Sequence, residues 1–363
     1  MTLMTFVYLI GGLILLVIGA EVLVRGAAKL AAQFGIPPLV VGLTVVAFGT
    51  SAPETAVSVQ AALDGSGDLA IGNVVGSNIG NVLFILGLTA LIAPLVVSRQ
   101  LIRLDVPIMI GASLLTLALA WDGALSRFDG AILFAGILAY TAFLIISSRR
   151  DKAAADDEFE KEYGQHEAPR PHAWMINTLL VLVGLALLVG GAHFLVEGAV
   201  GLARALGLSE LVIGLTVVAI GTSLPELATS VLAAIRGERD IAVGNIVGSN
   251  IFNLLCVLGL ASLVSPEAIV VSANALAFDI PVMIGVALAC LPIFFTGYSI
   301  ARWEGLVFLA YYAAYTTYLI LSTSAETVFA DRLGHAMLGY VLPLTAVTLL
   351  VLAAQAWRRQ QST

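Results

Sequence analysis

Apolar runs long enough to cross a bilayer alternate with short polar connections along almost the whole chain. A membrane-spanning helix needs about 20 mostly apolar residues. Eleven such runs lie near 3–24, 38–62, 69–94, 103–121, 128–146, 174–196, 211–234, 241–264, 275–295, 303–322 and 335–356. The pattern therefore predicts an all-α membrane protein with eleven spans, the last of which is interrupted by Gly and Pro.

Residues 147–172 interrupt this pattern. The segment SSRRDKAAADDEFEKEYGQHEAPRPH is rich in charged residues and poor in large apolar ones. That composition favours a flexible, solvated linker, and the segment is too short to fold as a separate regulatory domain. Its acidic run from Asp156 to Glu160 also lacks the glycine turn and the ligand spacing of a calcium-binding loop.

Basic residues divide unevenly between the two ends of the predicted spans. If the N-terminus is outside, 14 of the 17 Lys and Arg residues fall on cytoplasmic connections and 3 on the opposite side. This bias follows the positive-inside rule and predicts that the linker and the C-terminus are cytoplasmic. The first apolar run has no basic residue before it and no small-residue cleavage site, so we expect it to be retained as a span.

The composition agrees with a membrane protein. The chain of 363 residues is 60% hydrophobic and 11% charged, with a mean hydropathy of +1.01, whereas soluble domains carry about 25% charged residues. The net charge of −7 argues against a nucleic-acid partner. Cys256 and Cys290 lie in apolar runs and are expected to be buried thiols. We find no motif of an intramembrane protease or nucleotide enzyme, so no enzymatic activity is expected.

Two long segments are near copies of each other, one starting at Gly42 and the other at Gly214. About two thirds of their aligned positions are identical, far above chance for apolar sequences. The register never slips, since 226 − 54 and 253 − 81 both equal 172. A weaker echo follows, because DVPIMIG at Asp105 recurs as DIPVMIG at Asp279.

The repeat unit comprises five predicted helices, and an odd number inserts the second copy with the opposite orientation. Copies inverted in this way are related by a pseudo-two-fold axis in the membrane plane, and transporters place their site at the repeat interface. We therefore predict a first repeat in 1–146, a linker in 147–172, a second repeat in 173–322, and an extra helix with a cytoplasmic tail in 323–363. The extra helix is a candidate surface for homo-oligomer assembly.

The second predicted span carries polar side chains at mid-length. Pro53 has no N–H, so the carbonyl of Gly49 loses its helical partner and the helix is expected to kink. Positions Ala47, Thr50, Ser51 and Glu54 lie on a single helical stripe, so freed backbone carbonyls, two hydroxyls and a carboxylate share one face. The next span adds polar side chains at four-residue steps, at Asn73, Ser77 and Asn81.

The second copy repeats this set of ligands at Ala219, Thr222, Ser223, Glu226, Asn245, Ser249 and Asn253. Pooled across the symmetry axis, the ligands are all oxygen and include two carboxylates, which indicates a site for a hard cation. Calcium takes 6–8 oxygens in a flexible cage, whereas magnesium demands stricter octahedral geometry. No thiolate or histidine belongs to the stripes, so zinc and copper are not expected.

Glu54 and Glu226 are costly to bury and are therefore expected to be functional. A carboxylate at the bilayer centre costs about 2.5–3.5 kcal/mol on insertion scales, and two facing carboxylates also repel. One divalent cation, two monovalent cations or two protons would neutralise the pair. The pair therefore predicts competition between one Ca²⁺ and several Na⁺ or H⁺, which is coupled exchange.

Other polar residues receive structural interpretations. Glu21 and its repeat counterpart His193 are expected near the ends of spans, away from the ions. Asp105 and Asp279 each precede a proline by two residues and are expected to be helix N-caps. Ser58 and Ser230 follow the two glutamates by one helical turn, and either support of the glutamates or simple packing would fit them.

At these residues the sequence resembles the cation/Ca²⁺ antiporter superfamily, and most closely its prokaryotic sodium/calcium exchangers. The resemblance rests on the paired G-T-S-x-P-E and G-N-x-V-G-S-N motifs. It implies an electrogenic antiporter in the prokaryotic plasma membrane that exports Ca²⁺ against Na⁺ without a cofactor. It further implies that Glu54 and Glu226 bridge Ca²⁺, and that the other ligands are Ala47, Thr50, Ser51, Ser77, Asn81, Ala219, Thr222, Ser223, Ser249 and Asn253.

One departure from the superfamily leaves the coupling ion open. Some exchangers carry Asp at the position of Asn253, so this chain has two formal negative charges in the site rather than three. Ca²⁺/H⁺ or K⁺-dependent exchange is therefore the main alternative. A cation channel is a further alternative, although a central two-carboxylate trap between inverted halves is poorly suited to conduction.

Overall fold

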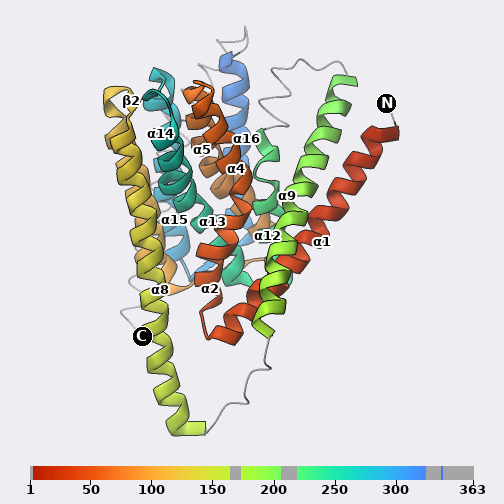
Figure 1. Cartoon of the computed structure of the whole chain (residues 1–363), viewed down its shortest axis with the longest axis vertical. Coiled ribbons are helices and arrows are strands. Elements are labelled where there is room, and N and C mark those ends of the chain that lie inside the picture. The colour runs from red at the N-terminus through yellow and green to blue at the C-terminus, as the bar shows by residue number, and fades with distance from the viewer. Residues whose placement is uncertain (1–2, 164–172, 206–218, 324–336, 338–363) are drawn as a thin grey trace.

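Helices account for nearly all of the computed structural model, which describes residues 3–163, 173–205, 219–323 and 337 (Figure 1). The first half contains α1 Leu3–Phe34, α2 Pro38–Val41, α3 Ala47–Thr50, α4 Ala52–Leu63, α5 Gly67–Gly80, α6 Gly87–Ile92, α7 Val106–Leu119 and α8 Arg127–Tyr163. The second half contains α9 Ala173–Ala205, α11 Ala219–Gly221, α12 Leu224–Ile235, α13 Arg239–Phe252, α14 Leu258–Val264, α15 Ile280–Phe295 and α16 Arg302–Thr323.

Wider π-helical turns join several of these helices. In the described residues they are η1 Gly42–Val46, η2 Asn81–Leu86, η3 Leu101–Asp105, η6 Asn253–Val257 and η7 Ala275–Asp279. Of these, η2 and η6 occupy equivalent positions in the two repeats, as do η3 and η7. Such turns are frequent at functional sites, and η2 and η6 begin at the predicted ligands Asn81 and Asn253.

Within the described residues, eight helices are long and apolar enough to cross a membrane, and a ninth span is a bent pair. The bend of 48° separates Pro38–Thr50 from Ala52–Leu63, where the sequence predicts a kink. The predicted all-α membrane fold is thereby confirmed. The predicted span 335–356, apart from residue 337, lies outside the described residues, as does the first part of the span 211–234.

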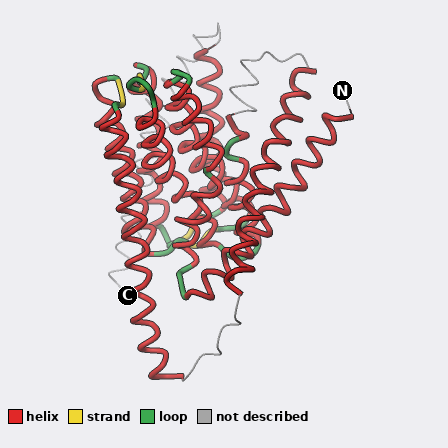
Figure 2. Tube along the Cα trace, viewed as in Figure 1, coloured by secondary structure: helices red, strands yellow, loops and turns green. Residues whose placement is uncertain are grey.

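Two short strand pairs join the repeats to each other. Strand β1 Leu95–Val96 pairs antiparallel with β4 Ser299–Ile300, and β2 Ala124–Leu125 pairs antiparallel with β3 Ile269–Val270. Each pair takes one strand from each repeat, and the pairs lie at opposite ends of the bundle (Figure 2). This arrangement agrees with a two-fold axis that runs across the molecule rather than along it.

Helices α1 and α9 form an antiparallel pair that leans away from the other helices at its upper end (Figure 1). Glycines recur every seventh residue on both, at 12, 19 and 26 and at 184, 191 and 198. A Cβ on Gly12 would lie 2.5 Å from the backbone nitrogen of Leu195, and a Cβ on Gly184 would lie 2.6 Å from that of Leu23. The two backbones therefore touch directly, as small residues allow in membranes.

Helix α8 extends below the bundle to Tyr163 (Figure 1). The expectation of a flexible linker from residue 147 is therefore wrong as far as Tyr163, and residues 164–172 lie outside the described part of the chain. The reason is that Ala, Glu and Lys in this stretch are strong helix formers. Its polar composition excludes a packed core but does not exclude a helix.

Asp105 and Asp279 are not helix N-caps, contrary to expectation. Both lie in continuous helical backbone, where the turns η3 and η7 end, and neither carboxylate caps the helix that follows. Instead, Tyr140 donates a hydrogen bond to Asp105 at 2.9 Å, and Tyr315 donates one to Asp279 at 3.1 Å. The prolines suggested that a helix starts here, but the π-turns η3 and η7 continue directly into α7 and α15 without a break.

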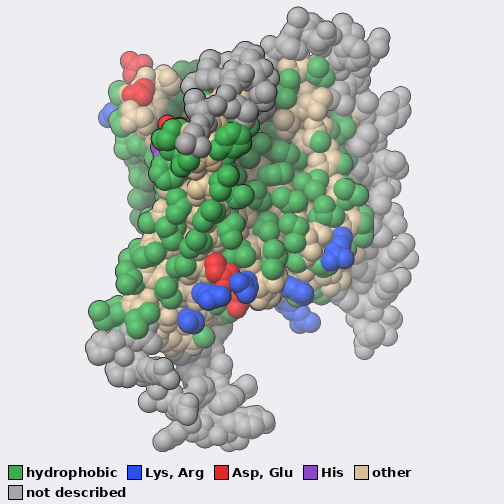
Figure 3. All heavy atoms as spheres, turned by 90° about the vertical axis from the view of Figure 1, so that its right-hand side faces the viewer, with side chains coloured by type: hydrophobic (Ala, Val, Ile, Leu, Met, Phe, Trp, Pro, Cys, Tyr) green, Lys and Arg blue, Asp and Glu red, His purple; other side chains and the backbone are tan. Residues whose placement is uncertain are grey.

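Charged and apolar side chains are unevenly distributed on the surface. On the face in Figure 3, Lys and Arg side chains gather mainly at the lower end of a broad apolar area. This is the end from which α8 extends (Figure 1). The apolar area is what a lipid-facing surface requires, since the bilayer offers no water to polar groups.

Candidate cation site

Each predicted site begins at a break in a helix. Helix α3 ends at Thr50 and α4 begins at Ala52, and Ser51 between them has the non-helical angles φ −81° and ψ 13°. The second break is similar, because α11 ends at Gly221 and Ser223 precedes α12. Proline near the start of the new helix accounts for both breaks, since it cannot donate to the preceding turn.

The two glutamates lie in the first turns of the helices that follow these breaks, and each is held by the opposite repeat. Ser51 Oγ donates to Glu226 Oε1 at 2.9 Å, and Ser223 Oγ donates to Glu54 Oε1 at 2.9 Å. Glu54 is 1% exposed and Glu226 is 0% exposed. The structure therefore brings the two carboxylates to one buried centre, as the repeat symmetry predicts.

Neighbouring polar side chains extend this centre. Thr50 Oγ1 donates to Asn245 Oδ1 at 3.0 Å and approaches the carbonyl of Ala47 at 3.4 Å. Ser223 Oγ lies 3.4 Å from Ser77 Oγ. Thr50, Ser223 and Ser77 thus share one hydrogen-bonded cluster with the glutamates.

Asn73 and Asn245 support the glutamate-bearing helices from behind. Asn73 Nδ2 donates to Ser58 Oγ at 2.9 Å and to the carbonyl of Glu54 at 3.3 Å. Asn245 Nδ2 makes the equivalent bonds to Ser230 Oγ and to the carbonyl of Glu226, at 2.9 and 3.4 Å. Ser58 and Ser230, for which the sequence allowed either support or packing, therefore bond to the same asparagines that donate to the glutamate carbonyls.

Several buried oxygens at this centre have no hydrogen-bond partner within the described part of the chain. They include one carboxylate oxygen on each glutamate, two amide oxygens and two hydroxyls, namely Glu54 Oε2, Glu226 Oε2, Asn81 Oδ1, Asn253 Oδ1, Thr222 Oγ1 and Ser249 Oγ. Buried polar atoms in native proteins nearly always have partners, so such a cluster needs an explanation. A hard cation would supply the missing partner, because every one of these atoms is an oxygen.

The described residues contain no group of three or more His, Cys, Asp or Glu side chains arranged to hold a metal. A cation at this centre would therefore rely on two carboxylates and neutral oxygens. Of the predicted ligands, Asn81 and Asn253 each donate a hydrogen bond from the side-chain amide to another asparagine. Ala219 begins α11, and its side chain lies outside the described part of the structure.

Asn78 and Asn250 are the residues that sequence reasoning missed. Asn81 Nδ2 donates to Asn250 Oδ1 at 3.0 Å, and Asn253 Nδ2 donates to Asn78 Oδ1 at 3.2 Å. The signal was available, because both asparagines belong to the duplicated G-S-N motif. The four-residue stripe from Asn73 to Asn81 does not include position 78, so the stripe gives no indication of this role.

A small pocket reaches the centre from one side. It is lined by Gly76, Ser77, Gly80, Phe84, Ile85, Ile220, Ser223, Leu227 and Tyr312. Ser77 and Ser223, which belong to the glutamate cluster, form part of its wall. Ser223, which donates to Glu54 Oε1, is therefore part of both the pocket wall and the glutamate cluster.

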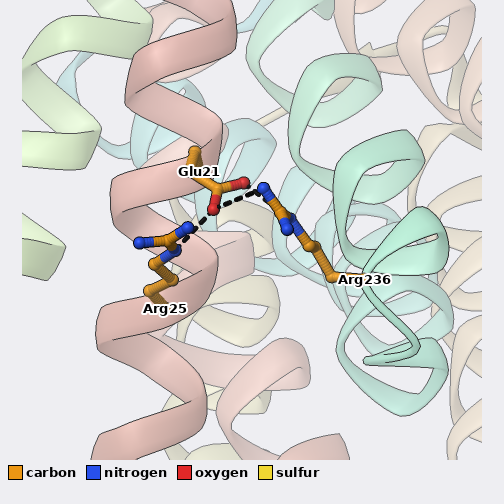
Figure 4. A network of polar contacts seen from close by, with 3 residues as sticks. All are labelled: Glu21, Arg25 and Arg236. Atoms are coloured by element: carbon orange, nitrogen blue, oxygen red, sulfur yellow. Dashed lines mark hydrogen bonds and ion pairs between the residues drawn. The ribbon is translucent and has the colours of Figure 1, made fainter.

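Glu21 lies outside the site, as the sequence predicts. Its carboxylate on α1 pairs with Arg25 on the same helix and with Arg236, directly after α12, at 2.7 Å (Figure 4). His193, its repeat counterpart, lies 3.7 Å from Glu197 at an exposed position. The ion pair of Glu21 links the α1–α9 pair to the end of the second glutamate helix.

The family comparison covers most of the chain. A family model described as sodium/calcium exchanger protein matches residues 4–146 and 176–321. These two stretches correspond to the two repeats, apart from the residues near their ends.

Individual relatives agree with the family model. The inner membrane protein YrbG of Escherichia coli is 40% identical over 78% of this chain and 87% of its own length. The sodium/calcium exchanger MaX1 of Methanosarcina acetivorans is 34% identical over 86% of this chain and 98% of its own. A solved structure of the sodium-calcium exchanger NCX_Mj superposes with a TM-score of 0.74 at 30% identity, covering 86% of this chain and 98% of that one.

Proposed function

The chain belongs to the sodium/calcium exchanger family, and from this premise we propose that it exchanges Ca²⁺ for Na⁺ across the plasma membrane by alternating access. The observation that carries the proposal is the pair of buried glutamates with one unpartnered oxygen on each. Without a bound cation, two facing carboxylates inside a bilayer would be energetically unfavourable. A transported cation would compensate both.

In this proposal Glu54 and Glu226 bridge Ca²⁺, and neutral oxygens complete its shell. The neutral candidates are Ala47, Thr50, Ser51, Ser77, Asn81, Ala219, Thr222, Ser223, Ser249 and Asn253. The crossed serine bonds support this role, because each fixes one carboxylate oxygen and leaves the other for an ion. Flexible coordination by oxygens from several helices suits Ca²⁺ better than Mg²⁺.

Charge balance supplies the coupling. The site carries two formal negative charges, since Asn81 and Asn253 are neutral. One Ca²⁺ or two Na⁺ would neutralise the pair, whereas the empty pair would repel and resist burial. The carrier would then cross only when loaded with one kind of ion or the other, and this is the requirement for exchange rather than leak.

The test is gradient-driven flux in proteoliposomes that contain the purified full-length chain. An outward Na⁺ gradient is expected to drive uptake of radiolabelled Ca²⁺, and Na⁺ replaced by choline should abolish the uptake. Uptake driven only by a pH gradient would instead establish Ca²⁺/H⁺ exchange, and a requirement for K⁺ would establish K⁺-dependent exchange. Uptake that persists without any counter-ion would establish a channel and overturn the proposal.

We further propose that the N-terminus is outside and that residues 147–172 and the C-terminus are cytoplasmic in a prokaryotic inner membrane. The uneven distribution of Lys and Arg supports this orientation. One relative is itself described as an inner membrane protein. Reporter fusions after residue 155 should show cytoplasmic activity only, and periplasmic reporter activity at that position would reverse the orientation.

A further inference from the structure

We propose that Asn78 and Asn250 are positioning residues, each of which orients a ligand amide of the opposite repeat. Asn78 would orient Asn253, and Asn250 would orient Asn81, so that the amide oxygens of Asn253 and Asn81 remain free for the cation. This inference rests on the proposed function, because it assigns a role within the same ion site.

The hydrogen bonds determine which end of each ligand amide is free. Asn253 Nδ2 is occupied by Asn78 Oδ1 at 3.2 Å, and Asn81 Nδ2 is occupied by Asn250 Oδ1 at 3.0 Å. The oxygens Asn253 Oδ1 and Asn81 Oδ1 have no partner among the described residues. All four side chains are at most 2% exposed, so bulk water does not satisfy these oxygens.

Asn78 and Asn250 are themselves fixed at both ends of their amides. Asn78 Nδ2 donates to the carbonyl of Asn250 at 3.2 Å and contacts Met283 Sδ at 3.7 Å. Asn250 Nδ2 donates to the carbonyl of Asn78 at 3.4 Å and contacts Met109 Sδ at 3.4 Å. Each asparagine therefore presents a defined end of its amide to the opposite repeat.

A flipped amide at position 78 would create two unfavourable contacts. Its Nδ2 would face the Nδ2 of Asn253, so two donors would meet, and its oxygen would face the carbonyl of Asn250, so two acceptors would meet. With Asn78 fixed in this way, Asn253 can satisfy its own N–H only by turning its oxygen away from Asn78. The same reasoning applies to Asn250 and Asn81.

These bonds all run between the repeats. Asn78 lies on α5, Asn250 lies on α13, and their targets begin the following π-turns η2 and η6. Each half of the cation site is thus arranged by a residue of the other half. Residues that orient a metal ligand typically change metal affinity by about 10- to 100-fold when removed.

The experiment is a pair of double-mutant cycles read by equilibrium ⁴⁵Ca²⁺ binding to the purified full-length protein. Asn78→Ala and Asn253→Ala should each weaken Ca²⁺ binding by about 10-fold, and the double variant should be no weaker than Asn253→Ala alone. Asn250→Ala should couple to Asn81→Ala in the same way. The pairs within one repeat, Asn78 with Asn81 and Asn250 with Asn253, should show nearly independent effects.

If Asn78 only stabilised the packing of α5 against α13, the result would be different. In that case Asn78→Ala would lower the melting temperature without changing Ca²⁺ affinity, or its effect would multiply with that of Asn253→Ala. Either result would overturn the inference. If Asn78→Ala does not fold, Asn78→Leu, which has a similar size but no hydrogen-bonding group, replaces it in the same cycle and is subject to the same criteria.

Asn177→Ala is the matched control, because it removes another amide bond between the repeats. Asn177 Nδ2 donates to Gln33 Oε1 at 3.1 Å, between α9 and α1 and away from the glutamates. Its loss should leave Ca²⁺ affinity unchanged. If the unmodified chain fails to bind Ca²⁺, or if Glu54→Gln binds it normally, the proposed site is wrong. If both behave as proposed but Asn78 does not couple to Asn253, or Asn250 to Asn81, only this inference is wrong.

Discussion

The two repeats carry the same ligand types at the centre, yet their surroundings differ. In the first repeat, Gly76 and Gly80 border the pocket, and a Cβ on Gly76 would meet no described atom within 4 Å. In the second, a Cβ on Gly248 would lie 2.8 Å from Leu43 Cα, and Phe252 takes the place of Gly80 and packs edge-on against Phe48 at 5.2 Å.

This difference shows how a nearly symmetric sequence produces an asymmetric structure. Ser249 is fully buried, whereas its counterpart Ser77 forms part of the pocket wall. Inverted repeats that exchange such environments are the basis of alternating access. However, Gly80 and Phe252 differ in the sequence itself, so the two sides are not interchangeable even after such an exchange.

The largest expected effect tests whether the two halves are equal at the centre. Glu54→Gln and Glu226→Gln should each abolish Na⁺-driven Ca²⁺ uptake, by at least about 100-fold, because either change removes half of the charge that holds the ion. The measurement is radiolabelled Ca²⁺ flux in proteoliposomes. Glu304→Gln is the control, since this buried carboxylate accepts a backbone bond from Ala301 and lies outside the glutamate cluster; normal flux in either site variant would contradict the prediction.

Substituting each of Gly80 and Phe252 by its counterpart in the other repeat should have the next largest effect. Gly80→Phe should fill the pocket beside Ser77 and slow Ca²⁺ uptake by about 10-fold or more, because access to the centre is narrowed. Phe252→Gly should instead lower stability by about 3–5 kcal/mol, since it removes a packed aromatic ring. Initial uptake rates and thermal unfolding separate the two outcomes, and unchanged uptake in Gly80→Phe would show that ions do not use this pocket.

Alanine substitutions at the equivalent residues Gly76 and Gly248 should test the difference in packing between the two repeats. Gly248→Ala should destabilise the protein by about 1–3 kcal/mol, because the new methyl would meet the backbone of Leu43 and the Cβ of Ala47. Gly76→Ala should be neutral, or stabilising by up to about 1 kcal/mol through helix propensity. Thermal unfolding in detergent measures both, and equal destabilisation by the two substitutions would mean that the repeats are packed alike.

The smallest expected effect concerns the ion pair between α1 and the end of α12. Glu21→Gln should cost about 0–1 kcal/mol of stability, because both arginine partners are more than half exposed and water screens them. The loss should shrink further in high salt. Unfolding at low and high ionic strength tests this, and a salt-independent loss of several kcal/mol would show that Glu21 is a major structural link.

Much of the site could be predicted because each feature had a local cause. Pro53 required a break in the helix, and the structure bends by 48° at that point. The offset of 172 residues paired Glu54 with Glu226, and the structure links both to the opposite serines. The flexible backbone expected in 147–163 and the capping role expected for Asp105 were wrong, because neighbours in sequence do not reveal that α8 continues or that Tyr140 reaches Asp105. The role of 147–172 as the linker between the repeats stays a prediction.

The sequence alone determined that the chain belongs in a membrane, that it contains an inverted repeat, and that oxygen-bearing side chains are available at the centre. Hydrophobicity, repeat offset and proline position can be read from the linear chain without knowing which distant segments meet. Only the tertiary structure decided which serine bonds to which glutamate, how Asn78 and Asn250 bond to the opposite repeat, and which residues of the two repeats line the pocket. These features depend on contacts between segments about 170 residues apart, where packing selects one arrangement from several that the same pattern permits.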